Sequence, residues 1–248
     1  MLGDILTVMW KEAKGLLRHQ GSRGKTMLGL LVPVVMLGVY LPLQIGRALV
    51  EGPWSLLISV FIPMMMVGMT ISESFAGERE RHTLGTLLAS RLPDRAILIG
   101  KVAVAVGYAW GMTLLLLLLS MAMVNVTHWD GQVLLYSPTM ALANGAFSLL
   151  LANLVAWLGV LISLRAATVQ QAQQTLMTAT LFPVVLLQMI PLLLLNVVPD
   201  GRAYLRELLA AADPQQVMFI VMAILVVLDL ALLVAAMARF KRARLVVP

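Results

Sequence analysis

The stretch LIGKVAVAVGYAWGMTLLLLLLSMAMVN, residues 98–125, decides what kind of fold this chain can adopt. Its only charged side chain is that of Lys101. A helix of about 20 apolar residues crosses the roughly 30 Å hydrocarbon core of a bilayer. Because backbone N–H and C=O groups in lipid must be hydrogen-bonded within their own segment, this stretch is predicted to be a transmembrane helix.

The whole chain shares this apolar character. Of its 248 residues, 60% are hydrophobic and 12% are charged, whereas soluble domains have about 45–50% and about 25%. The chain has no cysteine, which excludes disulfides, thiolate metal sites and a cysteine nucleophile. Its net charge of +6 comes from basic residues placed between apolar blocks, so we expect no nucleic-acid partner.

Five further blocks are long enough to cross a membrane, and an amphipathic segment, residues 1–24, precedes them. We therefore predict an all-α membrane protein with six transmembrane helices in a single transmembrane domain, residues 1–248. The predicted spans are 27–49, 54–72, 98–125, 139–164, 175–195 and 217–238.

Lysine and arginine residues are concentrated in alternate connections between the predicted spans. Of the 18 in the chain, all except Arg47, Arg202 and Arg206 lie on the side that contains both chain ends. Basic residues accumulate on the cytoplasmic side of membrane proteins. We therefore expect a multi-pass protein of the plasma (inner) membrane, with the N- and C-termini in the cytoplasm.

The segment before the first predicted span has the pattern of an interfacial helix. Apolar residues recur every three or four positions, and charged residues occupy the other face. Such a helix lies in the headgroup plane of the bilayer. The apolar positions are Leu2, Ile5, Leu6, Met9, Ala13, Leu16 and Leu17, and the charged positions are Asp4, Lys11, Glu12, Lys14 and Arg18.

The longest predicted cytoplasmic connection, residues 73–97, lies within ESFAGERERHTLGTLLASRLPDRAILIGK. An alternating acid–base cluster, residues 78–81, is followed by leucines at helical spacing. Pro93 breaks this pattern, and the next helix is predicted to begin at Asp94. A helix–break–helix hairpin projecting from the membrane is suited to contact with a soluble partner.

Two runs of this sequence resemble one known family. The run S-F-A-G-E-R-E-R-x-T-L-x-x-L-L-x-x-x-x-P-x-x-x-x-x-x-G-K, from Ser74 to Lys101, resembles the signature between spans two and three of type-2 ATP-binding cassette (ABC) exporter permeases. ISLRAATVQQAQQ, residues 162–174, resembles the short cytoplasmic turn after that family's fourth span. The chain departs from the commonest pattern at His82, where the family usually has glycine.

The resemblance implies that this chain is an ABC transporter permease subunit and not itself an enzyme. A coupling helix, residues 80–90, would sit in a cleft of a separate ATPase subunit, and residues 1–24 would form the connecting helix. Two permease chains, by default a homodimer, would move substrate by alternating access. The residues implied in coupling are Glu78, Arg79, Glu80, Arg81, Thr83, Leu84, Leu87 and Leu88.

The sequence also indicates where ATP would be hydrolysed. It contains no G-x-x-x-x-G-K-[ST] phosphate loop, so ATP and Mg would bind on the partner ATPase and this chain would bind no cofactor. His19, His82 and His128 lie in three separate connections, and we therefore expect no metal site. The aliphatic spans leave the substrate open among drugs, lipids, peptides, heme-like molecules and ions.

Four of the polar residues inside the predicted spans are candidates for a substrate path or for interhelical contacts: Asp229, Asn144, Asn153 and Gln188. Asp229 is a carboxylate among leucines, where a charge costs about 2.5–3.5 kcal/mol on insertion scales. Asn144, Asn153 and Gln188 either bridge helices or line a substrate path. An alternative function is therefore an ion-coupled secondary transporter that uses Asp229. An intramembrane hydrolase is disfavoured, because Asp229 has no second aspartate at membrane depth.

Overall fold

The computed structural model describes residues 1–18, 31–83, 91–197 and 213–240, and within these ranges every regular element is a helix. A short 3-10 turn, Pro53–Ser55, precedes α5, and π-helical turns occupy Met36–Tyr40 and Glu73–Gly77. The α-helices are α1 (Leu2–Arg18), α3 (Leu41–Ile45), α4 (Ala48–Glu51), α5 (Leu56–Ser72), α6 (Glu78–Glu80), α8 (Asp94–Thr127), α9 (Pro138–Ser163), α10 (Val169–Val197) and α12 (Pro214–Arg239).

Four helices are long and apolar enough to cross a membrane: Pro53–Glu80, Asp94–Thr127, Pro138–Ser163 and Gln215–Arg239. They overlap the predicted second, third, fourth and sixth spans, and are consistent with an all-α membrane protein. In the region of the first predicted span the described helix, Leu31–Ile45, is shorter, and the fifth predicted span lies within α10. A total of six spans therefore remains a prediction.

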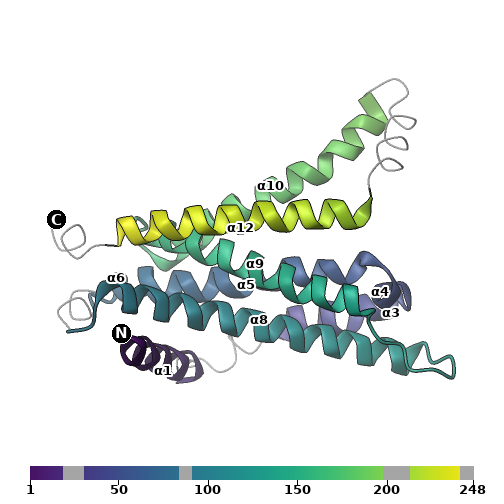
Figure 1. Cartoon of the computed structure of the whole chain (residues 1–248), viewed down its shortest axis with the longest axis horizontal. Helices are drawn as coiled ribbons and strands as arrows, with labels where there is room; N and C mark the ends of the chain where they lie inside the picture. Colours follow the sequence, from purple (N-terminus) through teal and green to yellow (C-terminus); the bar gives the residue numbers. More distant parts are fainter. Residues whose placement is uncertain (19–30, 84–90, 198–212, 241–248) are drawn as a thin grey trace.

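The helix that contains α5 forms the centre of the bundle. It packs against α8 and α9, and α12 lies along the outer side of α9 (Figure 1). In the most apolar 18-residue segment of the helix that contains α5, 67% of the residues are buried. In the corresponding segment of α12, only 11% are buried. α10 begins against α5 and α9 and then leans away from the other helices (Figure 1). The outward faces of α10 and α12 are therefore open to lipid or to another chain.

α1 crosses the bundle near one end and lies directly on α8 (Figure 1). The close approach depends on Gly100, because a Cβ atom there would lie 2.7 Å from Cγ1 of Val8 and 3.3 Å from the carbonyl oxygen of Ile5. Val8 is correspondingly buried. A larger residue at position 100 would force α1 and α8 apart.

The prediction of a helix before the first span is confirmed, but its two faces are used differently from the sequence pattern. Only part of the predicted apolar face packs against the bundle: Ile5 is half-buried, whereas Leu2 and Leu6 are exposed. The neighbouring Trp10 is exposed as well. The charged residue Glu12 turns toward α8 instead of toward water. The reason is a buried counter-charge on α8, described below.

The helix of the predicted second span does not end at residue 72. It continues through the π-helical turn Glu73–Gly77 into α6, with no proline to stop it. The helix ends near His82, which has φ of +57°, in the left-handed region that glycine favours. Beyond this point, Pro93 is extended and α8 begins at Asp94, as predicted.

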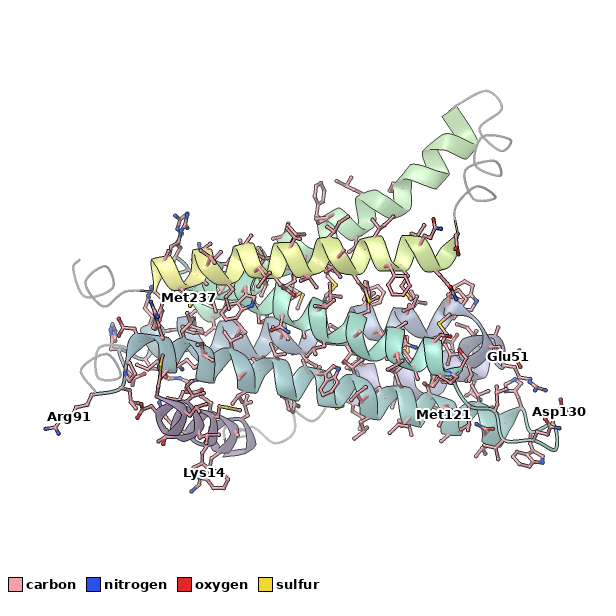
Figure 2. The ribbon with its side chains drawn as sticks, viewed as in Figure 1. Lys14, Glu51, Arg91, Met121, Asp130 and Met237 are labelled. Atoms are coloured by element: carbon pink, nitrogen blue, oxygen red, sulfur yellow. The ribbon has the colours of Figure 1, made fainter. Side chains whose placement is uncertain are left out.

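Charged residues are unevenly distributed between the two ends of the bundle. Lys14 and Arg91 lie at the end that carries α1, whereas Glu51 and Asp130 lie at the opposite end (Figure 2). The basic residues of α6, the start of α8 and the turn after α9 also belong to the first end. We call this the basic end.

Candidate functional site

A buried ionic cluster joins α1, α6 and α8 at the basic end. The side chain of Lys101 is 1% exposed, and its Nζ lies 3.0 Å from Oε1 of Glu12 and 2.9 Å from Oε1 of Glu78. The same Nζ donates a 2.9 Å hydrogen bond to the carbonyl oxygen of Ser74. An ammonium group has three donors, and each of them therefore has an acceptor here.

The cluster is electrically balanced. Nζ of Lys11 lies 3.6 Å from Oε1 of Glu78 and 3.8 Å from Oε1 of Glu12, so two lysines face two glutamates. The two carboxylates are largely buried, whereas Lys11 is 59% exposed. Burying charges costs several kcal/mol per ion unless they are paired and hydrogen-bonded. The ion pairs with Lys101 therefore stabilise the two buried carboxylates more than the ion pairs with the exposed Lys11 do.

The π-helical turn Glu73–Gly77 shapes the cluster from the α5 side. Such turns interrupt the usual hydrogen-bond ladder of an α-helix and are frequent at functional sites. Here the turn contributes the Ser74 carbonyl oxygen and the ring of Phe75, whose centroid lies 5.4 Å from Nζ of Lys101. Phe75 in turn meets Phe240 edge to face, at 5.9 Å between ring centroids. The residue that follows α12 thus also contacts the surroundings of the cluster.

Arg79 and Glu80, which follow Glu78 in α6, connect this helix to the turn between α9 and α10 and to the start of α10. Arg79 donates hydrogen bonds from Nη1 to the carbonyl oxygen of Ala166, at 3.0 Å, and from Nη2 to that of Leu164, at 2.5 Å. Oε2 of Glu80 accepts a 3.1 Å hydrogen bond from the backbone N–H of Val169. Val169 is the first residue of α10, where a carboxylate is favoured by the unpaired N–H groups and the helix dipole.

The end of the acidic–basic run folds back onto its own helix. Arg81 pairs with Glu73, and Thr83 donates from its backbone N–H and its Oγ1 to the carbonyl oxygen of Glu78, at 2.8 and 3.2 Å. The remaining residues implied in coupling, Leu84, Leu87 and Leu88, lie outside the described residues.

Four consecutive residues therefore contact five different parts of the molecule. Glu78 contacts α1 and α8, Arg79 the turn after α9, Glu80 the start of α10, and Arg81 the π-helical turn. We call Glu12, Glu78, Arg79, Glu80 and Lys101 the basal hub. A displacement of α6 would change contacts with α1, α8, α9 and α10 together, which is what a mechanical link requires.

The sequence prediction included three residues of the basal hub as site residues but omitted Glu12 and Lys101. The sequence pattern places Glu12 on the charged face of the amphipathic helix, and Lys101 enters it as one of the cytoplasmic basic residues and as the last residue of the family-like run. A signal for Lys101 did exist, because it is the only charge within the apolar stretch 98–125. Nothing in the sequence identified Glu12 as its partner.

The predicted polar residues of the spans lie apart from the basal hub in the sequence and make different contacts. Asn144 is buried and joins α9 to α5, accepting a 2.8 Å hydrogen bond from Ser59 Oγ and donating a 2.9 Å bond to Ser55 Oγ. Asn153 donates to the Leu149 carbonyl oxygen of its own helix at 2.9 Å. The side chain of Gln188 lies outside the described part of the chain.

Asp229 lies on the buried side of α12, between Leu225 and Ala236, while most other residues of that helix are exposed. Its Oδ1 is buried and has no hydrogen-bond partner among the residues that the structure describes. No hydrogen bond joins it to Asn144 or Asn153 in that part of the chain. Within the described ranges no group of three or more histidine, aspartate or glutamate side chains is arranged to hold a metal ion.

The opposite end of the bundle has a smaller ionic group on its surface. Arg47 follows the break at Gly46, where φ is +63°, and pairs with Glu51 and with Asp130 of the connection between α8 and α9. All three side chains are exposed, and exposed ion pairs contribute about 0–1 kcal/mol. This group ties a surface connection and is not a candidate site.

Comparison with known proteins finds no relative of this chain: no family model, no curated protein and no solved structure matches it.

Proposed function

We propose that this chain is the permease subunit of an ABC exporter, which moves substrate across a membrane while a separate ATPase subunit hydrolyses ATP. The observation that carries the proposal is the basal hub, in which consecutive residues of one short segment contact the ends of several membrane-length helices. This is the arrangement expected if force enters at one cytoplasmic segment and must reach the whole bundle.

In the proposed mechanism, residues 80–90 form the coupling helix that sits on the ATPase. ATP binding brings two ATPase subunits together, and the coupling helices move with them. Glu78 then pulls on Lys101 of α8 and on α1, while Arg79 and Glu80 pull on the turn between α9 and α10. Because breaking the pairs of buried Lys101 with Glu12 and Glu78 is costly, these pairs would transmit a tilt of α6 to α1 and α8, and the hydrogen bonds of Arg79 and Glu80 would carry it to the turn after α9 and to α10.

The position of His82 adds support to the family resemblance. The family usually has glycine there, and glycine adopts positive φ without a steric penalty. The backbone of His82 has φ of +57°, so this position keeps the conformation that a glycine would favour even though the side chain differs. His82 thus departs from the family in residue type and not in backbone geometry.

The remaining features of the proposal follow the charges and the exposed surfaces. We place the basic end in the cytoplasm, with six spans, both termini inside and the protein in the plasma (inner) membrane. A second permease chain, in a homodimer, would complete the pore, with ATP and Mg held by the ATPase partner. The exposed apolar residues of α10 and α12, such as Phe182 and Phe219, are open to such a chain or to lipid.

The proposal is tested by coupling between this chain and its ATPase. The full chain is coexpressed with the candidate ATPase subunit, purified as a complex and placed in nanodiscs, and ATP hydrolysis is measured. We expect deletion of residues 83–88 to abolish copurification or the stimulation of ATP hydrolysis, whereas Arg47→Gln, at the opposite end, leaves both unchanged. Full coupling in the deletion variant would refute the proposal.

A second candidate function rests on Asp229. A carboxylate within a membrane-length helix, with a buried oxygen that has no partner among the described residues, could bind a proton or sodium ion, which favours an ion-coupled secondary transporter. The chain alone, reconstituted in liposomes under a proton or sodium gradient, would then carry an ion current that Asp229→Asn abolishes. An ATP requirement together with unchanged transport in Asp229→Asn would exclude this function.

A further inference from the structure

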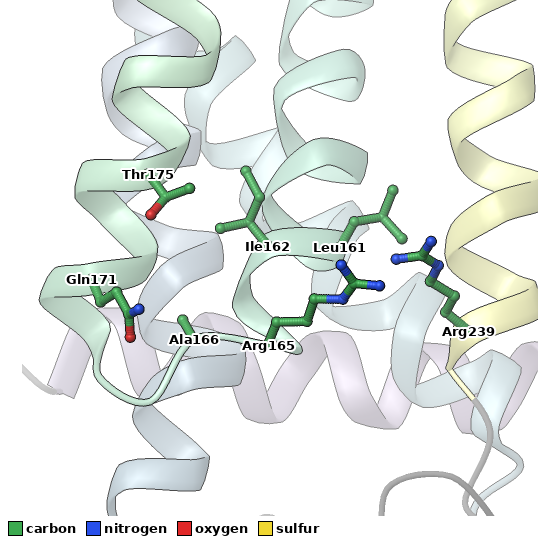
Figure 3. A pocket seen from close by; sticks show the side chains of 7 residues that line it. All are labelled: Leu161, Ile162, Arg165, Ala166, Gln171, Thr175 and Arg239. Carbon is green, nitrogen blue, oxygen red and sulfur yellow. The ribbon is translucent and has the colours of Figure 1, made fainter.

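A pocket of about 340 Å³ opens at the basic end, where α9 ends, α10 begins and α12 ends. Figure 3 shows its lining side chains, which come from all three of these helices and from the turn after α9. Two of them are arginines: Arg165 lies in that turn, and Arg239 is the last residue of α12. The others are Leu161, Ile162, Ala166, Gln171 and Thr175.

The two guanidinium groups converge although one belongs to the turn after α9 and the other to the end of α12. Figure 3 shows Arg165 directed across the pocket toward Arg239. Neither guanidinium group forms an ion pair or hydrogen bond with any residue that the structure describes, and both arginines are exposed. In the turn after α9, the carbonyl oxygens of Leu164 and Ala166 accept hydrogen bonds from Arg79.

An arrangement of two facing cations without an acceptor is unfavourable unless an anion lies between them. Like charges that face each other repel, although water partly screens the repulsion because both side chains are exposed. If each arginine merely extended from its helix end into water, the two side chains would have no reason to converge. The convergence therefore points to an anionic ligand and not to two independent surface charges.

We propose that this pocket binds a phosphate group between Arg165 and Arg239. The planar guanidinium fork matches phosphate oxygens and makes two parallel hydrogen bonds with them. Thr175 and Gln171 supply further polar atoms, and because Oε1 of Gln171 accepts from the N–H of Ala167, its NH₂ group remains to donate.

The surroundings of the pocket indicate where the phosphate comes from. α9 and α12 are both membrane-length helices, and the pocket lies at the end of each, which is the level of lipid headgroups in a bilayer. Leu161 and Ile162 form an apolar wall beside the arginines, as a glycerol backbone or acyl chain would require. Basic pockets between membrane helices bind the headgroups of anionic lipids. This inference does not depend on the proposed ABC function.

The test measures lipid retention and the response to soluble phosphate. The full chain is purified in detergent with equal amounts of phosphatidylglycerol and phosphatidylcholine, and bound lipid is counted by native mass spectrometry. In parallel, thermal unfolding is followed with added inorganic phosphate or glycerol 3-phosphate in phosphate-free buffer. We expect selective retention of phosphatidylglycerol, with the apparent affinity reduced at least about tenfold in the double variant Arg165→Gln/Arg239→Gln.

The control variant is Arg91→Gln, which removes one exposed positive charge at the same end of the bundle outside the pocket (Figure 2). It should retain the lipid as the wild type does. Arg165→Lys and Arg239→Lys keep the charge but lose the fork, so each should bind less tightly than the wild type. These single variants also carry the test if the double variant does not fold.

The two arms distinguish the sources of the phosphate. Arginine-dependent retention of phosphatidylglycerol assigns the site to a lipid headgroup, whereas arginine-dependent stabilisation by glycerol 3-phosphate without lipid preference assigns it to a soluble phosphate compound. Equal lipid retention and equal phosphate response in the wild type, the arginine variants and Arg91→Gln would overturn the proposal.

Discussion

Replacing Lys101 with methionine is expected to destabilise the chain more than any other single loss of a lysine charge in its described part. Methionine is an apolar side chain of similar length, so the change mainly removes the charge, together with its hydrogen bond to Ser74 and its position over the ring of Phe75. Lys101 is 1% exposed and is the nearest counter-charge to both Glu12 and Glu78, at 3.0 and 2.9 Å. Without it, the two largely buried carboxylates face each other.

The magnitude follows from the exposure of the groups. Removing one partner of a buried ion pair costs about 3–5 kcal/mol. Lys11 remains 3.6 Å from Glu78 and offsets part of this loss, so we expect about 3 kcal/mol for Lys101→Met. The matched control is Lys11→Met, which removes a charge that is 59% exposed and should cost less than about 1 kcal/mol.

The assay is equilibrium unfolding in mixed micelles with increasing sodium dodecyl sulfate, followed by tryptophan fluorescence and circular dichroism. The triple variant Lys101→Met/Glu12→Gln/Glu78→Gln removes all three charges together. It should recover most of the lost stability, because replacing a whole buried ionic group is often nearly neutral. Our reasoning is wrong if Lys101→Met is no less stable than Lys11→Met, or if the triple variant is less stable than Lys101→Met.

Three further predictions, one of them with a matched control, concern the packing and the connections around the basal hub. Gly100→Ala should lower the free energy of unfolding by about 1–3 kcal/mol, because its Cβ would lie 2.7 Å from Cγ1 of Val8 in α1. Gly107→Ala is the control: its Cβ would have no atom within 4 Å, so the same unfolding assay should show unchanged or higher stability. Arg79→Lys should speed amide hydrogen exchange over residues 164–169, because lysine cannot reproduce its two hydrogen bonds to backbone carbonyl oxygens, and unchanged exchange would contradict that link. His82→Gly should raise the free energy of unfolding by about 0.5 kcal/mol by relieving a φ of +57°, and a lower melting temperature would refute this.

The helical elements were largely predictable because their signals are local. Bilayer thickness sets the length of an apolar span, so residues 98–125 alone identified most of α8. Proline restricts the residue before it and cannot donate to the helix, and α8 accordingly begins just after Pro93. The end of the second span was not predictable in the same way. The sequence after residue 72 contains no strong helix breaker until the turn at His82, and the π-helical turn leaves no recognised pattern.

The candidate site was only half predictable. The alternating charges of residues 78–81 were visible in the sequence, but alternation does not say which partner each charge has. Glu12 illustrates the difficulty, since its place on the charged face of an amphipathic helix predicts contact with water, whereas the structure pairs it with a buried lysine.

The sequence by itself determined that this chain is helical, that it belongs in a membrane, and where basic residues are concentrated along it. These properties depend on residue type, on spacing along one helix and on the thickness of the bilayer. The tertiary structure alone decided that Lys101 meets Glu12 and Glu78, and that Arg165 faces Arg239. The physical reason is that such contacts depend on how each helix is rotated and crossed against its neighbours. That geometry is set by the steric fit of side chains such as Val8 against Gly100, which no local pattern contains.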